Sequence, residues 1–192
     1  MSEAAPRLWL CLGVLLWSAA HLLKSVAASS RAALVERLGN DAYRGVFSLV
    51  IIASVVLMVI GWRAADWSIL YVPPTWARHT NLLLMLVAMF LFAASGMPSN
   101  VKRAVRHPQL TGVIVWSVGH LLANGDSRSL VLFGGIGLWA VVSIVAINRR
   151  DGAWPKPAAV PISADLKAAG GGLVGYVVLY LAHPYLFGVA PM

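Results

Sequence analysis

The sequence predicts an all-α fold, a polytopic membrane helix bundle with about six transmembrane helices and a single domain over residues 1–192. Hydrophobic residues make up 59% of the chain and charged residues only 11%, whereas a soluble domain has about 25% charged residues. The mean hydropathy is +0.77. The apolar residues also gather in six runs, each close to the ~20 residues that a helix needs to cross a bilayer.

The six runs follow one another with short connections between them. They lie at residues 8–28, 45–62, 80–97, 107–124, 129–148 and 168–188. The first run has no basic region before it and no A-x-A motif after it, so we interpret it as a retained helix rather than a cleaved signal. Glycines in AAGGGL (168–173) weaken the expected start of the last helix.

The connections differ in character. Residues 29–45 alternate charged and apolar side chains, which predicts a short surface helix ending at Gly39-Asn40. YVPPTWARH (71–79) combines aromatic residues with two prolines and is typical of a turn at the membrane interface. Residues 149–167 are expected to form a proline-rich cytoplasmic linker to the last helix.

The basic residues predict the orientation in the membrane. The first, third and fifth loops carry eleven Lys and Arg residues, whereas the other loops and the termini carry four. The positive-inside rule therefore places these three loops in the cytoplasm and both termini on the outer side of the membrane, which would be the periplasm in a bacterial inner membrane. The net charge of +8 lies in short loops between apolar runs, so we expect the lipid bilayer as partner and no nucleic acid.

A seven-residue motif with a histidine occurs twice. WSAAHLL covers residues 17–23 and WSVGHLL covers residues 116–122. Histidine is costly inside a bilayer and normally faces the interior of a bundle. Imidazole binds haem iron, and bundles hold cofactors between facing helices, so we interpret His21 and His120 as metal ligands. The alternatives are that both histidines only pack between helices, or that the motif marks an inverted repeat of three helices.

Other polar residues accompany the second motif. Counted in steps of three and four residues, one helix face carries Gln109, Ser117, His120 and Asn124. Gly112 and Gly119 would let a neighbouring helix approach closely. His107 opens this helix just before a proline. His79 and His183 are expected nearer the outer face and are rival candidates for the second axial ligand.

Longer stretches around the two motifs resemble the NnrU family of membrane proteins. The resemblance is strongest over residues 1–150. It rests on RHPQLTGVIVWSVGHLLANGD (106–126) with LFGG (132–135), HLLKS (21–25), YRGVFSLV (43–50) and PPTWARH (73–79). It implies an inner-membrane protein linked to nitrite and nitric oxide metabolism, which means denitrification or respiratory redox metabolism. Nitrogen-oxide reductase or respiratory subunits are the implied partners.

The same family includes a haem-dependent cis–trans isomerase of a carotenoid. Its histidine ligands correspond to His120 and His21, which implies haem b as cofactor. Trp17 and Trp116 would then flank the cofactor, and His107, Asn124 and Asp126 would order its surroundings. Ser117 stands where the isomerase has a cysteine ligand.

A second resemblance suggests a different activity. R-H-P-x-L-x-G (106–112) is similar to a stretch that helps isoprenylcysteine-type membrane methyltransferases hold S-adenosylmethionine. Those enzymes also carry an acidic pair after the next helices, and here the fifth run ends in Arg149-Arg150-Asp151. The sequence therefore leaves open whether the protein is an enzyme, with the haem-dependent isomerase as the first enzymatic alternative and the methyltransferase as the second.

Overall fold

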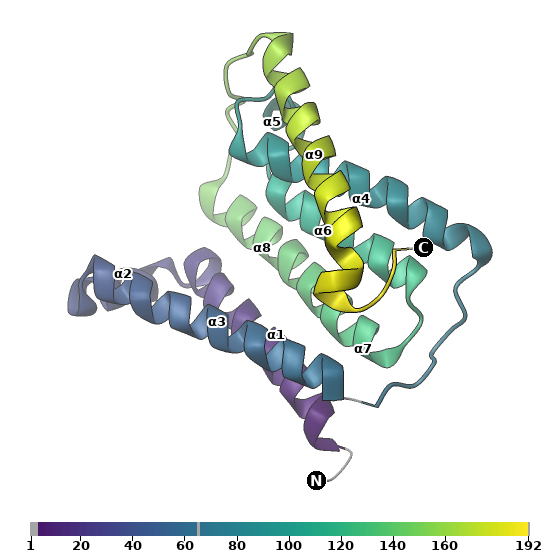
Figure 1. The fold of residues 1–192 in the computed structure, drawn as a ribbon. Helices are drawn as coiled ribbons and strands as arrows, with labels where there is room; N and C mark the ends of the chain where they lie inside the picture. The colour runs from purple at the N-terminus through teal and green to yellow at the C-terminus, as the bar shows by residue number, and fades with distance from the viewer. Residues whose placement is uncertain (1–3, 65, 192) are drawn as a thin grey trace. The chain divides into compact units, whose positions relative to one another are not determined.

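A computed structural model describes residues 4–64 and 66–191 and confirms the all-α prediction (Figure 1). The helices are α1 (Ala4–Val26), α2 (Ala28–Leu38), α3 (Asn40–Ala64), α4 (Thr75–Gly96), α5 (Val101–Ala104), α6 (Pro108–Ala123), α7 (Ser127–Ser129), the π-helix η1 (Leu130–Gly134), α8 (Gly135–Asp151) and α9 (Ile162–Phe187). Within these ranges the β-pairing is limited to one isolated antiparallel bridge between Ile69 and Asp126.

Each of the six predicted apolar runs is mostly helical, and the fifth spans the end of α7, η1 and most of α8. Five described helical segments are long and apolar enough to cross a membrane: Arg7–Val26, Asn40–Ala64, Thr75–Gly96, Ser127–Asp151 and Ile162–Phe187. The remaining run forms α6, which has 16 residues. At ~1.5 Å per residue it is about 24 Å long, somewhat shorter than a hydrocarbon core of ~30 Å. The polytopic helix bundle is thus confirmed.

The helices form two compact units. The first unit contains the chain up to Tyr71 together with residues 125–150, and so holds α1, α2, α3, α7, η1 and α8. The second contains residues 72–124 and the chain from Asp151 onward, and so holds α4, α5, α6 and α9.

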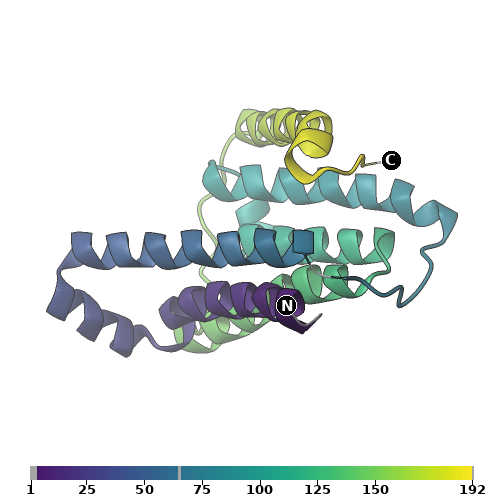
Figure 2. The same ribbon diagram turned by 60° about the horizontal axis from the view of Figure 1, so that its bottom comes forward.

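In the first unit, α1 lies alongside α3 (Figures 1 and 2). Two glycines permit this contact, one from each helix. A Cβ atom built on Gly13 would lie 2.7 Å from the carbonyl oxygen of Ser54, and one built on Gly61 would lie 2.7 Å from the Cα atom of Leu10. Real Cβ atoms do not come so close to backbone, so the two helices pack through small residues as membrane helices commonly do.

In the second unit, α4 lies between α6 and α9 (Figure 2). Gly112 and Gly119 of α6 and Gly172 of α9 face α4. A Cβ atom at these positions would come within 2.9, 2.5 and 2.8 Å, respectively, of atoms of α4. The prediction that Gly112 and Gly119 allow close helix approach is therefore confirmed.

Helix boundaries agree with the turn signals in most places. The short surface helix α2 ends at Leu38, and Gly39 follows with a φ of +80°, a backbone conformation that favours glycine. The last helix differs, because it begins at Ile162 and includes the glycines of residues 170–172 in its interior. Gly172 is accommodated there by its contact with α4, and the non-helical part of the linker shortens to residues 152–161.

Candidate functional site

The first histidine motif orients His21 on α1. Its Nδ1 lies 2.9 Å from the carbonyl oxygen of Trp17, one turn earlier in the same helix. A carbonyl oxygen only accepts hydrogen bonds, so Nδ1 carries the hydrogen and Nε2 of the neutral ring carries the lone pair. The His21 ring also contacts the rings of Trp17, Trp139 and Phe47, with centroid distances of 4.0, 5.4 and 5.4 Å. Aromatic rings from three helices therefore hold the imidazole in place.

The second motif repeats this local geometry on α6. The Nδ1 of His120 lies 2.9 Å from the carbonyl oxygen of Trp116, and the two rings are 4.9 Å apart. Asn124 ends the helix, where its backbone N–H and its Nδ2 both donate to the carbonyl oxygen of His120 at 2.9 and 2.8 Å. The neutral His120 ring is thus also in the tautomer whose lone pair lies on Nε2.

The two motifs are longer than the sequence analysis recognised. The pattern G-V-x-x-W-S-x-x-H-L-L covers residues 13–23 and again residues 112–122, with seven of eleven positions identical. Gly13 and Gly112 begin the two copies, and each contacts a neighbouring helix of its own unit. Alignment of the two stretches beyond their tryptophans would have found these glycines. Each compact unit therefore carries one copy, with the same helix-packing glycine and the same histidine geometry.

Both motifs also bury a serine hydroxyl. The Oγ atoms of Ser18 and Ser117 are shielded from solvent and have no hydrogen-bond partner among the described residues. The same holds for Nε1 of Trp139, Oγ of Ser143 and Oδ1 of Asn81. Buried polar groups in folded proteins nearly always have a partner, which can be an ordered water or a ligand. Each histidine motif thus contains one buried serine hydroxyl without a hydrogen-bond partner among the described residues.

The remaining predicted residues lie in the second unit but differ in setting. His183 is on α9, and its Nδ1 lies 2.7 Å from the carbonyl oxygen of Val189. His79 is exposed on α4. His107 precedes α6, and its carbonyl oxygen accepts a hydrogen bond from the N–H of Thr111 at 2.9 Å. Among the described residues, no group of three or more His, Cys, Asp and Glu side chains could hold a metal ion.

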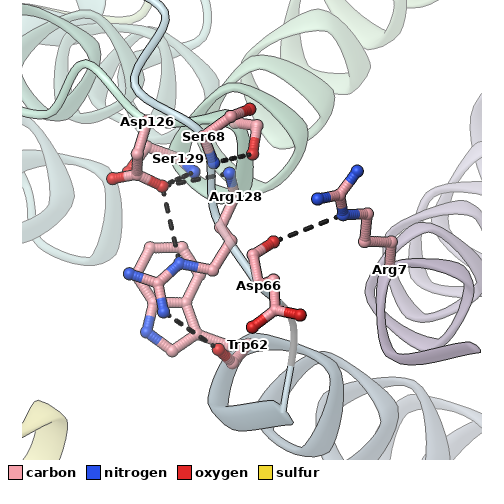
Figure 3. Close-up of polar contacts among 8 residues, drawn as sticks. Arg7, Trp62, Asp66, Ser68, Asp126, Arg128 and Ser129 are labelled. Carbon is pink, nitrogen blue, oxygen red and sulfur yellow. Dashed lines mark hydrogen bonds and ion pairs between the residues drawn. The ribbon is translucent and has the colours of Figure 1, made fainter. Parts of the chain in front are cut away.

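A polar cluster at the start of α7 was only partly anticipated (Figure 3). Asp126 caps this helix because its Oδ1 accepts from the backbone N–H groups of Arg128 and Ser129 at 3.0 Å each. Its Oδ2 accepts from the hydroxyl of Ser129 at 2.8 Å. The Arg128 guanidinium lies over the rings of Trp62 and Trp67, 4.7 and 5.3 Å from their centroids, and its Nε is 3.5 Å from Asp126.

This cluster fastens the segment that follows α3. The carbonyl oxygen of Gly125 accepts from the N–H groups of Leu70 and Tyr71, and the N–H of Ser127 donates to the carbonyl oxygen of Ser68. Burial and, to a smaller extent, the nearby charge of Asp126 raise the pKa of the Tyr71 hydroxyl. The backbone on either side of Asp126 therefore orders this connection, next to the helix that Asp126 caps.

A second polar cluster, which the sequence analysis missed, lies within the second unit. It holds the linker and the start of α9 to the segment around Asn100. Asn100 donates from Nδ2 to the carbonyl oxygen of Val160 and to Oδ2 of Asp165, at 2.8 and 2.6 Å. The Oδ1 of Asp165 accepts from the hydroxyl of Ser99 and the N–H of Asn100. At the other end of the linker, Arg106 donates to the carbonyl oxygen of Gly152 at 2.8 Å. An Asn and an Asp 65 positions apart give no recognisable sequence signal.

A family model described as NnrU protein matches residues 9–191. No curated protein and no solved structure matches the chain.

Proposed function

The chain belongs to the NnrU family, and from this premise we propose that it is a membrane protein that binds haem b and works in nitrogen-oxide or respiratory redox metabolism. In this proposal Nε2 of His21 and Nε2 of His120 are iron ligands. Trp17 and Trp116 lie against the ligand imidazoles, and His107 and Asn124 support the chain around the second ligand. The site lies in the inner membrane, and a nitrogen-oxide reductase or respiratory subunits are its proposed protein partners.

One observation supports the proposal above the others. In both motifs, the histidine Nδ1 is hydrogen-bonded to the backbone carbonyl oxygen four residues earlier, with an N–O distance of 2.9 Å. Histidines that bind metals usually donate their other ring N–H to a carbonyl or carboxylate, which fixes the tautomer and the direction of the ring. Two histidines in one chain with this same arrangement suit a cofactor that takes imidazole nitrogen as axial ligand.

The residues of the chain supply orientation and an apolar setting. The backbone carbonyls of Trp17 and Trp116 hold the ligand rings, and the surrounding indole rings limit the approach of water. Bound haem b would supply reversible one-electron chemistry. These residues would set its potential through ligand identity and burial, as in other haem proteins.

The test is a spectrum of the purified protein. The protein is prepared in mild detergent from cells supplied with haem precursor, and oxidised and reduced spectra are recorded with a pyridine haemochrome assay. We expect a Soret band with sharp reduced α and β bands in the wild type. His21→Ala and His120→Ala should lose or weaken these bands, whereas the exposed control His79→Ala should keep them. A colourless wild-type protein would refute haem binding.

Further measurements on this preparation separate the related activities. A band lost in His183→Ala but kept in His21→Ala would make His183 the second ligand. Changed isomer composition of carotenoids in expressing cells would favour the isomerase. Binding of S-adenosylmethionine that disappears in Arg106→Ala would favour the methyltransferase over the redox role.

A further inference from the structure

The contact between α1 and α8 in the first unit follows a simple register. Near the start of α8, a Cβ atom on Gly135 would lie 2.5 Å from Cγ1 of Val14. One turn further, the ring of Trp139 contacts the rings of Trp17 and His21 at 4.4 and 5.4 Å. These contacts show that the two helices run in the same direction, with residues about 120 positions apart lying side by side.

The contact surface between α1 and α8 forms a seam. At its C-terminal end, where both helices end, the contact is polar. The guanidinium NH1 of Arg150 donates to the carbonyl oxygen of Lys24 at 3.2 Å. The seam therefore changes along its length from a tight apolar contact at Gly135 to a basic end at Lys24 and Arg150. The charge distribution of the sequence predicts that this end faces the cytoplasm.

Three buried hydrogen-bonding groups lie on these two helices. They are the hydroxyl of Ser18 on α1 and, on α8, the indole N–H of Trp139 and the hydroxyl of Ser143. Helical spacing places the two serines on the facing sides, because Ser18 follows Val14 by four residues and Ser143 follows Trp139 by four. Ser143 is one turn beyond Trp139 and only 1% exposed, and Ser18 is next to Trp17 in the chain. None of the three has a hydrogen-bond partner among the described residues.

The chemistry of these groups restricts what could satisfy them. An indole N–H can only donate, so Trp139 requires an acceptor. Serine hydroxyls can donate as well, so one acceptor group with two oxygens could engage several of these donors. The positive charges of Lys24 and Arg150 at the same seam favour an acceptor that is negatively charged. A carboxylate meets all of these conditions.

We propose that the Ser18–Trp139–Ser143 seam binds a carboxylate of the ligand that His21 holds, which for haem b is a propionate. This inference rests on the proposed haem function and extends it to residues outside the histidine motif. Trp139 and Ser143 donate hydrogen bonds to the carboxylate, and the basic end of the seam attracts its charge. The seam thus determines the orientation in which the ligand binds to the first unit.

The test compares haem with its dimethyl ester, which lacks the carboxylate charge. Apoprotein in detergent is titrated with each compound, and the ratio of the two dissociation constants is measured. The wild type should bind haem at least tenfold more tightly than the ester. Since a hydrogen bond to a charged group contributes roughly tenfold in affinity, the double variant Trp139→Phe/Ser143→Ala should lower this ratio at least tenfold.

A matched control separates this effect from general loss of a serine. Ser54 is also fully buried, but its hydroxyl donates to the carbonyl oxygen of Ile51 at 2.7 Å, so Ser54→Ala should leave the ratio unchanged. If the double variant keeps the wild-type ratio, or if the wild type does not discriminate between the two compounds, the seam does not bind a carboxylate although haem binding stands. A wild type that binds neither compound overturns both this inference and the proposed function.

Discussion

Replacement of Asp126 by alanine should destabilise the first unit by about 3 kcal/mol, a value that follows from its separate contacts. Loss of an N-cap costs about 1 kcal/mol. The hydroxyl of Ser129, which is 0% exposed, would lose the carboxylate that it now contacts at 2.8 Å, at a cost of about 1–3 kcal/mol. The partly exposed ion pair with Arg128 adds less than about 1 kcal/mol.

The assay is unfolding of the detergent-solubilised protein by a denaturing detergent, followed by tryptophan fluorescence. Trp62 and Trp67 are useful reporters because Arg128 lies over both rings. Asp126→Ser separates the contributions, since serine caps a helix about as well as aspartate but carries no charge. It should therefore retain a substantial part of the lost stability.

Two outcomes would contradict this reasoning. If Asp126→Ala unfolds within about 0.5 kcal/mol of the wild type, the capping contacts do not hold this connection. If Asp126→Ser is as unstable as Asp126→Ala, the charge matters more than the cap, and Arg128→Met should then cause a similar loss.

Two more predictions concern packing and the linker. Gly61→Leu should destabilise the protein by more than about 2 kcal/mol, because the leucine side chain would collide with the backbone of α1. Gly96→Leu is the control and should be tolerated, because nothing lies within 4 Å of its added Cβ. Equal unfolding curves for the two variants would refute this. Asn100→Ala and Asp165→Ala should each release the linker and increase cleavage by proteinase K within residues 152–161, measured by mass spectrometry against the wild type. Unchanged cleavage in both variants would show that other contacts hold the linker.

Apolar run length was sufficient to predict the long helices. Turn signals were reliable where one residue type determines the backbone, as at Gly39, whose positive φ separates α2 from α3. They misplaced the start of the last helix, which begins at Ile162 and not near residue 168, because the glycines of residues 170–172 lower helix propensity only locally. Contact with α4 at Gly172 compensates there, and such a tertiary contact cannot be read from residues 168–173 alone.

Only the part of the candidate site that lies within one helical turn could be predicted from the sequence. The bond from His21 to the Trp17 carbonyl lies within one helical turn, so the spacing within the motif anticipated that these residues act together. The contacts of His21 with Phe47 and Trp139 join residues far apart in sequence, and no pattern indicated them. For the same reason, Asn100 and Asp165 went unnoticed as partners.

The local character of the histidine bonds also bears on what these histidines are for. A histidine that joins two membrane helices contributes through a hydrogen bond across the interface. Here Nδ1 of His21 and Nδ1 of His120 are each bonded to their own helix, at the same 2.9 Å and the same four-residue spacing. Such a bond orients the ring without drawing helices together. Helix association in both units instead uses glycines, including the glycine that begins each copy of the motif. Packing therefore accounts for the glycines of the repeated motif, and the fixed tautomer of each histidine supports the proposal that it is a ligand.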